Sequence, residues 1–336
     1  MRKLASIQVI KSLEPIEGAD VIERAQVLGW GVVVKKGDFK VGDMVIYCEI
    51  DSVMPKRDEF SFLANARYRI KTIRLRGQIS QGICFPLSIL GEGIPHEEDL
   101  DVTEHLGVIK YEPVIPACLN GIQEGAFPSH IPKTDETRVQ TLPRMLKQYA
   151  GTPAYISLKL DGSSATYCIK DGKFIVASRG MSITENDKNS FWIVARRDNI
   201  EEKLRNMSES LGREVSMQGE LVGPSIQKNL LGLKQHEVYF FNFFMNDEHA
   251  FLGGKALSSL CDEYGLKMVP VLDWNHIIHD DIDAYINKYN GMSHAMYQNK
   301  QIEGVVIRPL QEVHDRYHGR ISFKVINNKF LLKHED

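Results

Sequence analysis

Short runs of alternating hydrophobic and polar residues fill roughly the first hundred positions, and Gly, Asp and Pro separate the runs. This alternation, with no sustained helical period, is typical of strands that bury one face. Five strands in this length favour a small closed barrel. The predicted strands are Leu4–Leu13, Val21–Val34, Met44–Ile50, Tyr68–Leu75 and Ile79–Pro86.

The OB-fold is the commonest small barrel that also binds oligonucleotides, so we expect an OB-like β-barrel over residues 1–112. Five basic residues crowd into ten positions of this region, and no acid occurs between Glu59 and Glu92. On one strand, a bulge near Thr72 is needed to bring all five onto a single face. They are either solvated residues of a polar face or contacts to a phosphate backbone. The five are Arg67, Arg69, Lys71, Arg74 and Arg76.

Residues 113–153 hold six of the thirteen prolines and no long apolar period. Such a composition indicates a connector between two domains. Within it, Thr134–Gln140 has the pattern of a capped helix start, with Asp or Thr as the N-cap. The connector is therefore expected to contain a helix.

Residues 154–336 alternate between strand-like and helix-like segments, which predicts an α+β domain with mainly antiparallel sheets. Helices are predicted at Phe191–Leu211, Ala256–Tyr264 and Asp281–Tyr289. Strands are predicted at Tyr155–Leu160, Ser164–Ile169, Phe174–Ser178, Val215–Val222, Val238–Phe244, Gly304–Arg308 and Ser322–Val325.

Composition agrees with a globular protein of two domains. The chain has 336 residues, of which 43% are hydrophobic and 25% charged. The net charge of −3 excludes a generally basic nucleic-acid coat but permits a local basic groove. The longest apolar patch, Val238–Met245, is too short to span a bilayer, and no targeting segment is visible. We therefore expect neither a membrane span nor secretion.

Cysteine and histidine spacing gives no sign of a metal centre. The five cysteines are far apart and lack Cys-x-x-Cys spacing, so neither a disulfide framework nor a zinc ribbon is expected. A reducing cytoplasm fits this usage best. The closest-spaced histidines, His276 with His279 and His314 with His318, lie in polar surroundings and are interpreted as surface residues.

The sharpest local sequence is Ser157–Ser164, in which Lys159 ends an apolar strand and Asp161-Gly162 follows after one residue. The amine thus stands beside a tight turn whose backbone amides can approach a phosphate. Asp-Gly is also an ordinary hairpin turn, and a second copy at Lys170–Lys173 is interpreted as nothing more. Taken alone, the motif therefore indicates little.

An ordered set of segments follows this motif. They are Ala177–Gly180 with an arginine, Gln218–Pro224 with a carboxylate, the aromatic strand Tyr239–Phe243, Ile302–Arg308 with another carboxylate, and Ser322–Val325 with a lysine. In this order the segments resemble motifs I, Ia, III, IIIa, IV and V of the covalent nucleotidyltransferases, the superfamily of polynucleotide ligases and messenger-RNA capping enzymes. With an OB-like domain in front and nothing after motif V, the layout is most similar to RNA ligases of the Naegleria and Deinococcus type.

The resemblance implies a nucleotidyltransferase domain with ATP-grasp-like antiparallel sheets, and the activity of an ATP-dependent RNA ligase. Lys159 then attacks the α-phosphorus of ATP, the AMP passes to an RNA 5′-phosphate, and an RNA 3′-OH displaces it. Lys324 contacts the α-phosphate. Burial and a divalent cation lower the pKa of a lysine whereas Asp161 alone raises it, so Mg²⁺ or Mn²⁺ is expected between them. Asp161 and Glu303 are the expected metal ligands, acting through water.

The same resemblance assigns further nucleotide contacts. Glu220 accepts from the ribose hydroxyls, Phe241 stacks on adenine, and Arg179 binds phosphate or ribose. Arg138 reaches the β- or γ-phosphate. The residues alone leave plainer alternatives, namely an exposed lysine on a polar strand face for Lys324, a surface turn for Glu220, a core aromatic for Phe241, and a surface ion pair for Arg179.

Motif V departs from the superfamily pattern at one position. A second lysine is common two residues after the first, and here that position is Ile326. Either Lys324 acts alone or Lys329 supplies the second charge.

Two other classes of function stay open. A capping guanylyltransferase or a DNA ligase normally carries an OB domain after motif V, and none follows here. A non-enzymatic OB-fold RNA-binding protein would have a decayed nucleotide pocket, against which the intact Lys159, Glu220, Glu303 and Lys324 argue. The expected partners are RNA strands with 5′-phosphate and 3′-OH ends, in the cytoplasm or in a eukaryotic nucleus. The sequence favours no oligomeric state, and a monomer is compatible with it.

Overall fold

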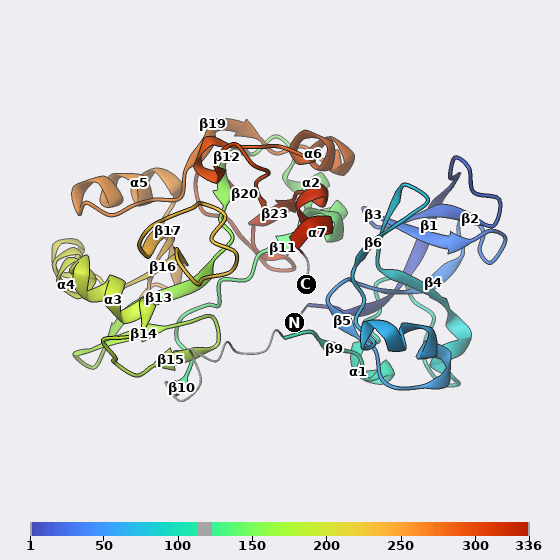
Figure 1. The fold of residues 1–336 in the computed structure, drawn as a ribbon, viewed down its shortest axis with the longest axis horizontal. Helices are drawn as coiled ribbons and strands as arrows, with labels where there is room; N and C mark the ends of the chain where they lie inside the picture. The colour runs from blue at the N-terminus through green and yellow to red at the C-terminus, as the bar shows by residue number, and fades with distance from the viewer. Residues whose placement is uncertain (1, 113–122, 335–336) are drawn as a thin grey trace. The chain divides into compact units, whose positions relative to one another are not determined.

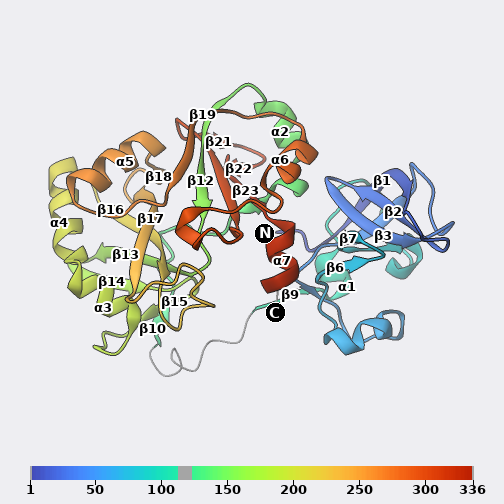
Figure 2. The same cartoon turned by 45° about the horizontal axis from the view of Figure 1, so that its top comes forward.

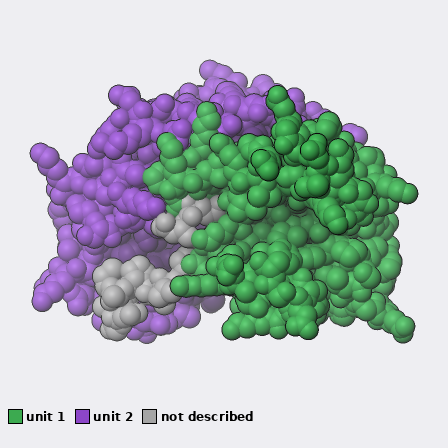
Figure 3. All heavy atoms as spheres, turned by 45° about the vertical axis from the view of Figure 1, so that its right-hand side comes forward, with its two compact units in different colours: residues 1–114, 139–144, 328–336 green, residues 115–138, 145–327 purple. Residues whose placement is uncertain are grey.

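The computed structural model describes residues 2–112 and 123–334, and it divides into two compact units (Figure 3). The first unit comprises Met1–Val114, Val139–Arg144 and Asn328–Asp336. The second comprises Ile115–Arg138 and Met145–Asn327. Part of the predicted connector, residues 113–122 with Cys118, lies outside the described residues.

The first unit is built on a five-stranded antiparallel sheet that curls around an apolar core (Figure 1). The predicted strand at Val21–Val34 is in fact two strands, because the chain reverses at Leu28-Gly29 between them. The sheet order is β3 (Trp30–Lys35), β2 (Ile22–Val27), β1 (Ala5–Pro15), β4 (Met44–Cys48) and β8 (Ile83–Pro86).

The basic stretch of this unit does not form one strand. The 3-10 helix η1 (Asp58–Ala66) precedes it and is followed by Arg67 and Tyr68, whose φ angles of 54° and 62° are left-handed. The strand predicted from Tyr68 therefore begins only at Thr72, because left-handed residues do not continue a strand. It forms a separate hairpin of β6 (Thr72–Leu75) and β7 (Gln78–Gln81).

Short elements complete the first unit. They include two segments distant in sequence, held by Gly29 N–H donating to Gln140 O at 2.8 Å and by Gln81 Nε2 donating to Asn328 Oδ1 at 3.2 Å. The helix expected to start at Thr134–Gln140 is wrong, because the chain there forms strand β11 (Thr137–Arg138) and a 3-10 turn. The short elements are β5 (Ser52–Val53), β9 (Ile109–Lys110), η2 (Leu87–Leu90), α1 (Thr103–Leu106), η4 (Val139–Thr141) and α7 (Asn328–His334), and α2 (Pro143–Tyr149) crosses the boundary between the units.

The second unit contains a seven-stranded antiparallel sheet with helices on one face (Figures 1 and 2). Residues at alternate positions of its central strands, such as Tyr167, Met217 and Phe240, pack with these helices in one apolar core. The other face of those strands carries polar residues, since successive side chains point to opposite faces. The sheet order is β10 (Gln123–Ala126), β15 (Met181–Ile183), β14 (Lys173–Ala177), β13 (Ser163–Lys170), β16 (Val215–Val222), β17 (Glu237–Met245) and β18 (Ala250–Phe251), and the helices are α3 (Ser190–Arg197), α4 (Ile200–Leu211) and α5 (Gly254–Glu263).

A second sheet of this unit has five strands, all antiparallel except for the parallel pair of β11 and β23. Its central strand is almost wholly buried, as expected from the apolar run Gly304–Arg308. The order is β11, β23 (Phe323–Ile326), β20 (Gly304–Pro309), β12 (Pro153–Lys159) and β19 (Val271–Ile277), and the flanking elements are α6 (Ile282–Tyr289), η5 (Ala295–Tyr297), β21 (His314–Asp315) and β22 (Gly319–Arg320).

Helix boundaries follow local capping chemistry. The Asn189 side chain accepts from Phe191 N–H at the start of α3, and Asp281 accepts from Ala284 N–H at the start of α6. The single helix predicted at Phe191–Leu211 is broken into α3 and α4, because Asn199 has a φ of 50°. Among the described residues, no helix combines the length and apolar character that crossing a membrane requires.

Candidate active site

Lys159 lies at the end of β12, next to the central strand of the five-stranded sheet. The preceding residues Ala154–Leu158 are buried, and the side chain of Lys159 emerges 26% exposed where the strand ends. Its backbone pairs with Gly304, which brings the neighbouring Glu303 alongside. The Lys159 Nζ donates to Glu303 Oε1 at 2.5 Å. Two motifs separated by 144 residues thus meet at one amine.

The turn after Lys159 is held by two features. Tyr297, fully buried, donates from its hydroxyl to the Lys159 carbonyl and accepts from Asp161 N–H, both at 3.0 Å. A Cβ at Gly162 would lie 2.4 Å from the Leu221 carbonyl oxygen, so only glycine permits this approach to β16. Sequence reasoning missed Tyr297, because no motif surrounds it.

Three carboxylates surround the amine, and their charges decide its state. Burial lowers the pKa of Lys159, but the attraction of Glu303, Glu220 and Asp161 outweighs burial, and the net shift is upward. Burial raises the pKa of Glu220 to about 8, against the attraction of Lys159. Burial and the charge of Glu303 raise the pKa of Asp161 to about 6. The single positive charge of Lys159 therefore does not balance the charges of the three carboxylates.

The residues present fit a divalent cation held largely through water. Glu303 Oε2 is buried and has no hydrogen-bond partner, so this oxygen is available to a cation or its water. Across residues 2–112 and 123–334, no three His, Cys, Asp or Glu side chains come close enough to hold a metal directly. Mg²⁺ usually keeps several waters and binds through one or two carboxylates, and the unpartnered Glu303 Oε2 suits such a cation.

Strand register places two further predicted residues on the same sheet face as Lys159. Lys324 pairs with Val306, and Val306 pairs with Ser157 on β12. The Lys324 side chain therefore lies on the same sheet face as Ser157 and as Lys159, which is two residues after Ser157. Arg138 lies opposite Lys324 in the parallel pair. The departure at Ile326 is accommodated in the core, since this side chain is 4% exposed. Lys329 lies on α7, in the first unit.

Phe241 lies on β17 at a β-bulge. Gln218 pairs with Asn242 and Gly219 with Phe240, so Phe241 is the extra residue of the bulged strand. Phe240 is fully buried in the core under the helices, whereas Phe241 is partly exposed. The structure thus separates a core aromatic from one directed to the other face, which the sequence left open. Glu220 lies on the neighbouring strand β16 and receives a hydrogen bond from Gly162 N–H.

Arg179 forms a surface ion pair, with its Nη2 2.7 Å from Asp135 Oδ1 and both side chains substantially exposed. This contact corresponds to the plainer of the two readings of Arg179. It leaves the guanidinium accessible, because exposed pairs are weak and exchange readily with a stronger anion.

The five basic residues of the first unit occupy different environments. Arg69 is engaged, since its Nη2 lies 3.0 Å from Asp51 Oδ1 and its guanidinium carbon lies 3.7 Å from the ring centre of Tyr111. Arg74 and Arg76 are exposed on the β6–β7 hairpin, together with Ile73 and Leu75. Arg67 is also exposed and Lys71 is half-buried.

The interpretation of all four paired histidines as surface residues is wrong for His276. It is 9% exposed, and its Nε2 shares a hydrogen bond of 2.8 Å with the Tyr285 hydroxyl. Burial lowers the pKa of His276. His276 lies on β19, where the alternation of side chains directs its ring inward. The sequence pattern did not reveal this strand.

Comparison with known proteins agrees with this geometry. A family model described as an OB-fold domain matches residues 4–87, and one described as RNA ligase matches residues 152–326. Solved structures of Naegleria gruberi RNA ligase are 35% identical. One, of a lysine-to-alanine mutant with ATP and Mn, has a TM-score of 0.86 over 99% of both chains. The structure with PPi has a TM-score of 0.86, and that of a lysine-to-methionine mutant with AMP and Mn has 0.87, each over 100% of both chains. No curated protein sequence matches.

The chain belongs to the RNA ligase family. The predicted fold is confirmed, with an OB domain at the N-terminus followed by an α+β domain. The prediction of an ATP-dependent RNA ligase is confirmed as well.

Proposed function

We propose that this chain joins RNA 5′-phosphate and 3′-OH ends with Lys159 as the nucleophile. In the first step a P–N bond forms between Lys159 and the α-phosphorus of ATP, and the bond to pyrophosphate breaks. The RNA 5′-phosphate then takes the AMP from the lysine, and the RNA 3′-OH finally displaces AMP from the adenylated end. The observation that carries this proposal is Lys159 Nζ at 2.5 Å from Glu303, among three carboxylates at a strand end.

Glu303 and Asp161 are proposed to hold Mg²⁺ or Mn²⁺, with the unpartnered Glu303 Oε2 as the first contact. When bound, the cation supplies positive charge that lowers the pKa of the neighbouring amine and stabilises charge on the phosphates. Without it the carboxylates keep Lys159 protonated and unreactive, because they raise its pKa. Lys159 is therefore a nucleophile only when Glu303 and Asp161 hold the cation.

The remaining side chains of this face are proposed to bind the nucleotide. The partly exposed Phe241 stacks on the adenine, and Glu220 accepts from the ribose hydroxyls. Lys324 neutralises the α-phosphate, on the same sheet face as Lys159. Arg138, opposite Lys324, and Arg179 act on the outer phosphates or the ribose. For Arg179 this requires exchange of its surface partner Asp135.

The first unit is proposed to bind the RNA backbone through exposed arginines. Arg74 and Arg76 project from the β6–β7 hairpin with exposed apolar neighbours, a combination that suits single-stranded RNA. Arg67 and Lys71 are proposed to extend this surface. Arg69 contributes indirectly, since its guanidinium is engaged within the unit.

A reducing compartment, the cytoplasm or a eukaryotic nucleus, is proposed as the place of action, with a monomer as the working form. The cysteines in the described part of the chain, Cys48, Cys84, Cys168 and Cys261, are free thiols. Burial raises the pKa of Cys84, Cys168 and Cys261 to about 12, which keeps these thiols unreactive. Free buried thiols are typical of reducing compartments.

The test is covalent labelling of the purified protein with α-³²P-ATP or α-³²P-GTP in the presence of Mg²⁺ or Mn²⁺. We expect label from ATP alone, and its loss in Lys159→Ala. The matched control is Lys170→Ala, which removes an exposed lysine from the second Lys-Asp-Gly turn and should label like the wild type. Label that persists in Lys159→Ala contradicts the assigned nucleophile, and label from GTP alone contradicts the assigned nucleotide.

A further inference from the structure

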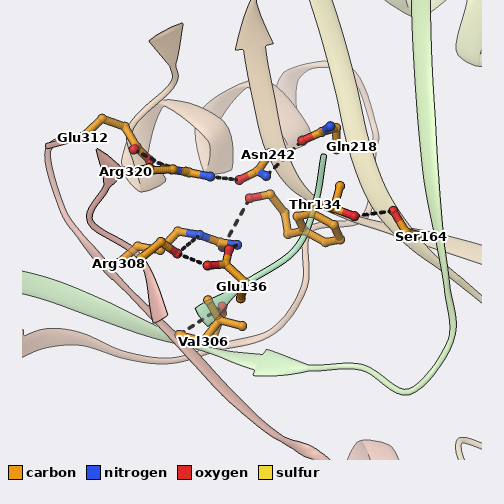
Figure 4. Close-up of polar contacts among 12 residues, drawn as sticks. Thr134, Glu136, Ser164, Gln218, Asn242, Val306, Arg308, Glu312 and Arg320 are labelled. Carbon is orange, nitrogen blue, oxygen red and sulfur yellow. Dashed lines mark hydrogen bonds and ion pairs between the residues drawn. The ribbon is translucent and has the colours of Figure 1, made fainter. Parts of the chain in front are cut away.

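A buried arginine joins three segments of the second unit. Arg308, on β20, is 2% exposed, and its Nη2 donates to Glu136 Oε1 at 2.6 Å. Its Nε donates to the Ser322 hydroxyl at 3.2 Å, and that hydroxyl donates to Glu136 Oε2 at 2.6 Å. Figure 4 shows the Glu136 and Arg308 side chains facing one another. We call Arg308, Glu136 and Ser322 the Arg308 triad.

Glu136 and Arg308 both stay ionised at neutral pH. Burial raises the pKa of Glu136, but the charges of Arg308 and Arg320 and the Ser322 hydroxyl outweigh burial and leave it below its ordinary value. Burial disfavours the charged form of Arg308, yet Glu136 more than compensates, and the pKa of Arg308 is raised. Since removal of either partner leaves a buried charge unpaired, the contact persists while the unit is folded.

Glu136 and Ser322 stand at the start of two paired strands. β11 has only two residues, and it pairs in parallel with β23 so that Arg138 lies opposite Lys324. Extension of this register by one rung past the strand ends puts Glu136 opposite Ser322, where their side chains are bonded. A slip of one residue would turn Arg138 to the other face of the sheet. The side-chain bond therefore fixes which face Arg138 presents.

The triad also contacts the bulge of β17. Arg308 Nη1 donates to the Phe241 carbonyl at 3.5 Å, and the guanidinium carbon lies 5.8 Å from the Phe241 ring centre. Phe241 is the extra residue of the bulge, and a bulge aims its side chain differently from the regular ladder. Arg308 thus supports the backbone from which the Phe241 ring projects.

We propose that the Arg308 triad positions the nucleotide-binding side chains, and that it acts through Phe241, Arg138 and Lys324 without touching the nucleotide. The three targets come from strands β17, β11 and β23, and the triad contacts or borders each of those strands. Without the triad, these three side chains lose their fixed orientation. The identity of the ligand rests on the proposed function.

The test measures binding of α,β-methylene-ATP with Mg²⁺ by titration calorimetry, because this analogue binds without transferring AMP. Glu136→Gln removes the charge with little change of shape, and Ser322→Ala removes the hydroxyl that bonds both Glu136 and Arg308 while keeping both charges. We expect each to raise the Kd about tenfold, measured at a temperature where the variant is folded. Glu136→Gln should also lower the melting temperature, because it leaves the charge of Arg308 buried without its partner. The double variant should bind no more than about threefold more weakly than the weaker single variant, because both act through one contact. The matched control, Glu185→Gln, neutralises the exposed partner of Arg196 in the same unit and should leave the Kd unchanged.

Self-adenylation with labelled ATP accompanies each titration. A Kd within twofold of wild type in folded Glu136→Gln and Ser322→Ala overturns the positioning role, as does an equal rise in Glu185→Gln. If the wild type binds the analogue but forms no covalent adduct with labelled ATP, the proposed function fails. The comparison of Kd values then still decides the role of the triad. A wild type that binds no analogue overturns both.

Discussion

The hydroxyl of Tyr297 donates to the main-chain carbonyl of Lys159 at 3.0 Å, and the same oxygen accepts from Asp161 N–H. One buried atom thus joins the two sides of the turn that carries the nucleophile. The 3-10 helix η5 that contributes Tyr297 lies more than a hundred residues further along the chain. The position of the Lys159 amine therefore depends on Tyr297, which takes no part in the proposed reaction.

Tyr297→Phe should slow lysine adenylation about tenfold and lower the free energy of unfolding by about 1–3 kcal/mol, because a buried carbonyl and a buried N–H lose their partner. Single-turnover labelling with ATP and urea denaturation measure the two effects. Tyr285→Phe is the control, since it removes another buried hydroxyl that bonds His276 and His279 N–H. Adenylation that slows equally in both variants would show a general loss of stability and contradict the role of Tyr297.

Glu220 should make the protein less stable as the pH rises when divalent cations are absent. Burial raises the pKa of Glu220 to about 8 from an ordinary value of 4.5, so between these values the folded state holds a proton that the unfolded chain has lost. The contribution is full below pH 4.5 and is lost as the pH rises through 8, at about 1.4 kcal/mol per pH unit for each proton. Asp161, with a pKa of about 6, adds a decline of the same sign.

Urea denaturation with EDTA between pH 5 and about pH 8.5 measures this slope, and Glu220→Gln should flatten it and be more stable than wild type at the upper end. Glu185→Gln, which neutralises an acid in an exposed ion pair with Arg196, serves as the control. An identical slope in wild type and Glu220→Gln would mean that Glu220 is ionised throughout.

Mn²⁺ should stabilise the wild type and have little effect on Glu303→Gln. A cation at a hundred times its Kd stabilises a folded protein by about 2.7 kcal/mol. Loss of the Glu303 charge removes the carboxylate whose Oε2 has no other partner. Thermal denaturation and electron paramagnetic resonance of free Mn²⁺ measure stability and binding independently of catalysis. Asp171→Asn, in the second Lys-Asp-Gly turn, should keep the wild-type shift, and retained binding in Glu303→Gln would exclude it as a ligand.

Sequence reasoning reached Lys159, Glu303 and Lys324 through the resemblance of their ordered segments to nucleotidyltransferase motifs, since the Lys159 segment alone indicates little. The apolar runs beside these residues are readable locally, and strand register places the two lysines on one sheet face. The fold class followed from the same patterns.

The errors arise where tertiary contacts override local preference. Thr134–Gln140 carries helix-capping residues, yet Thr137–Arg138 pairs with β23, next to Glu136, which is bound by Arg308 and Ser322. Tyr297 also escaped notice, since a tyrosine in a 3-10 turn has no periodic signal. Neither long-range contact leaves a trace in neighbouring residues, so a single sequence does not reveal them.

Charge reversal at Arg74 and Arg76 should impair strand joining more than adenylation. Both side chains are exposed on the β6–β7 hairpin of the first unit, whereas every group proposed to act on ATP lies in the second. Conversion of both to glutamate should reduce sealing of nicked RNA at least tenfold, leave self-adenylation within about twofold, and lower the salt dependence of RNA binding by about two phosphate contacts. Lys35→Glu with Lys36→Glu, on the exposed end of β3, makes the same charge change elsewhere on the unit. Equal loss of both steps, or equal loss of sealing in the control, would place RNA binding outside the hairpin.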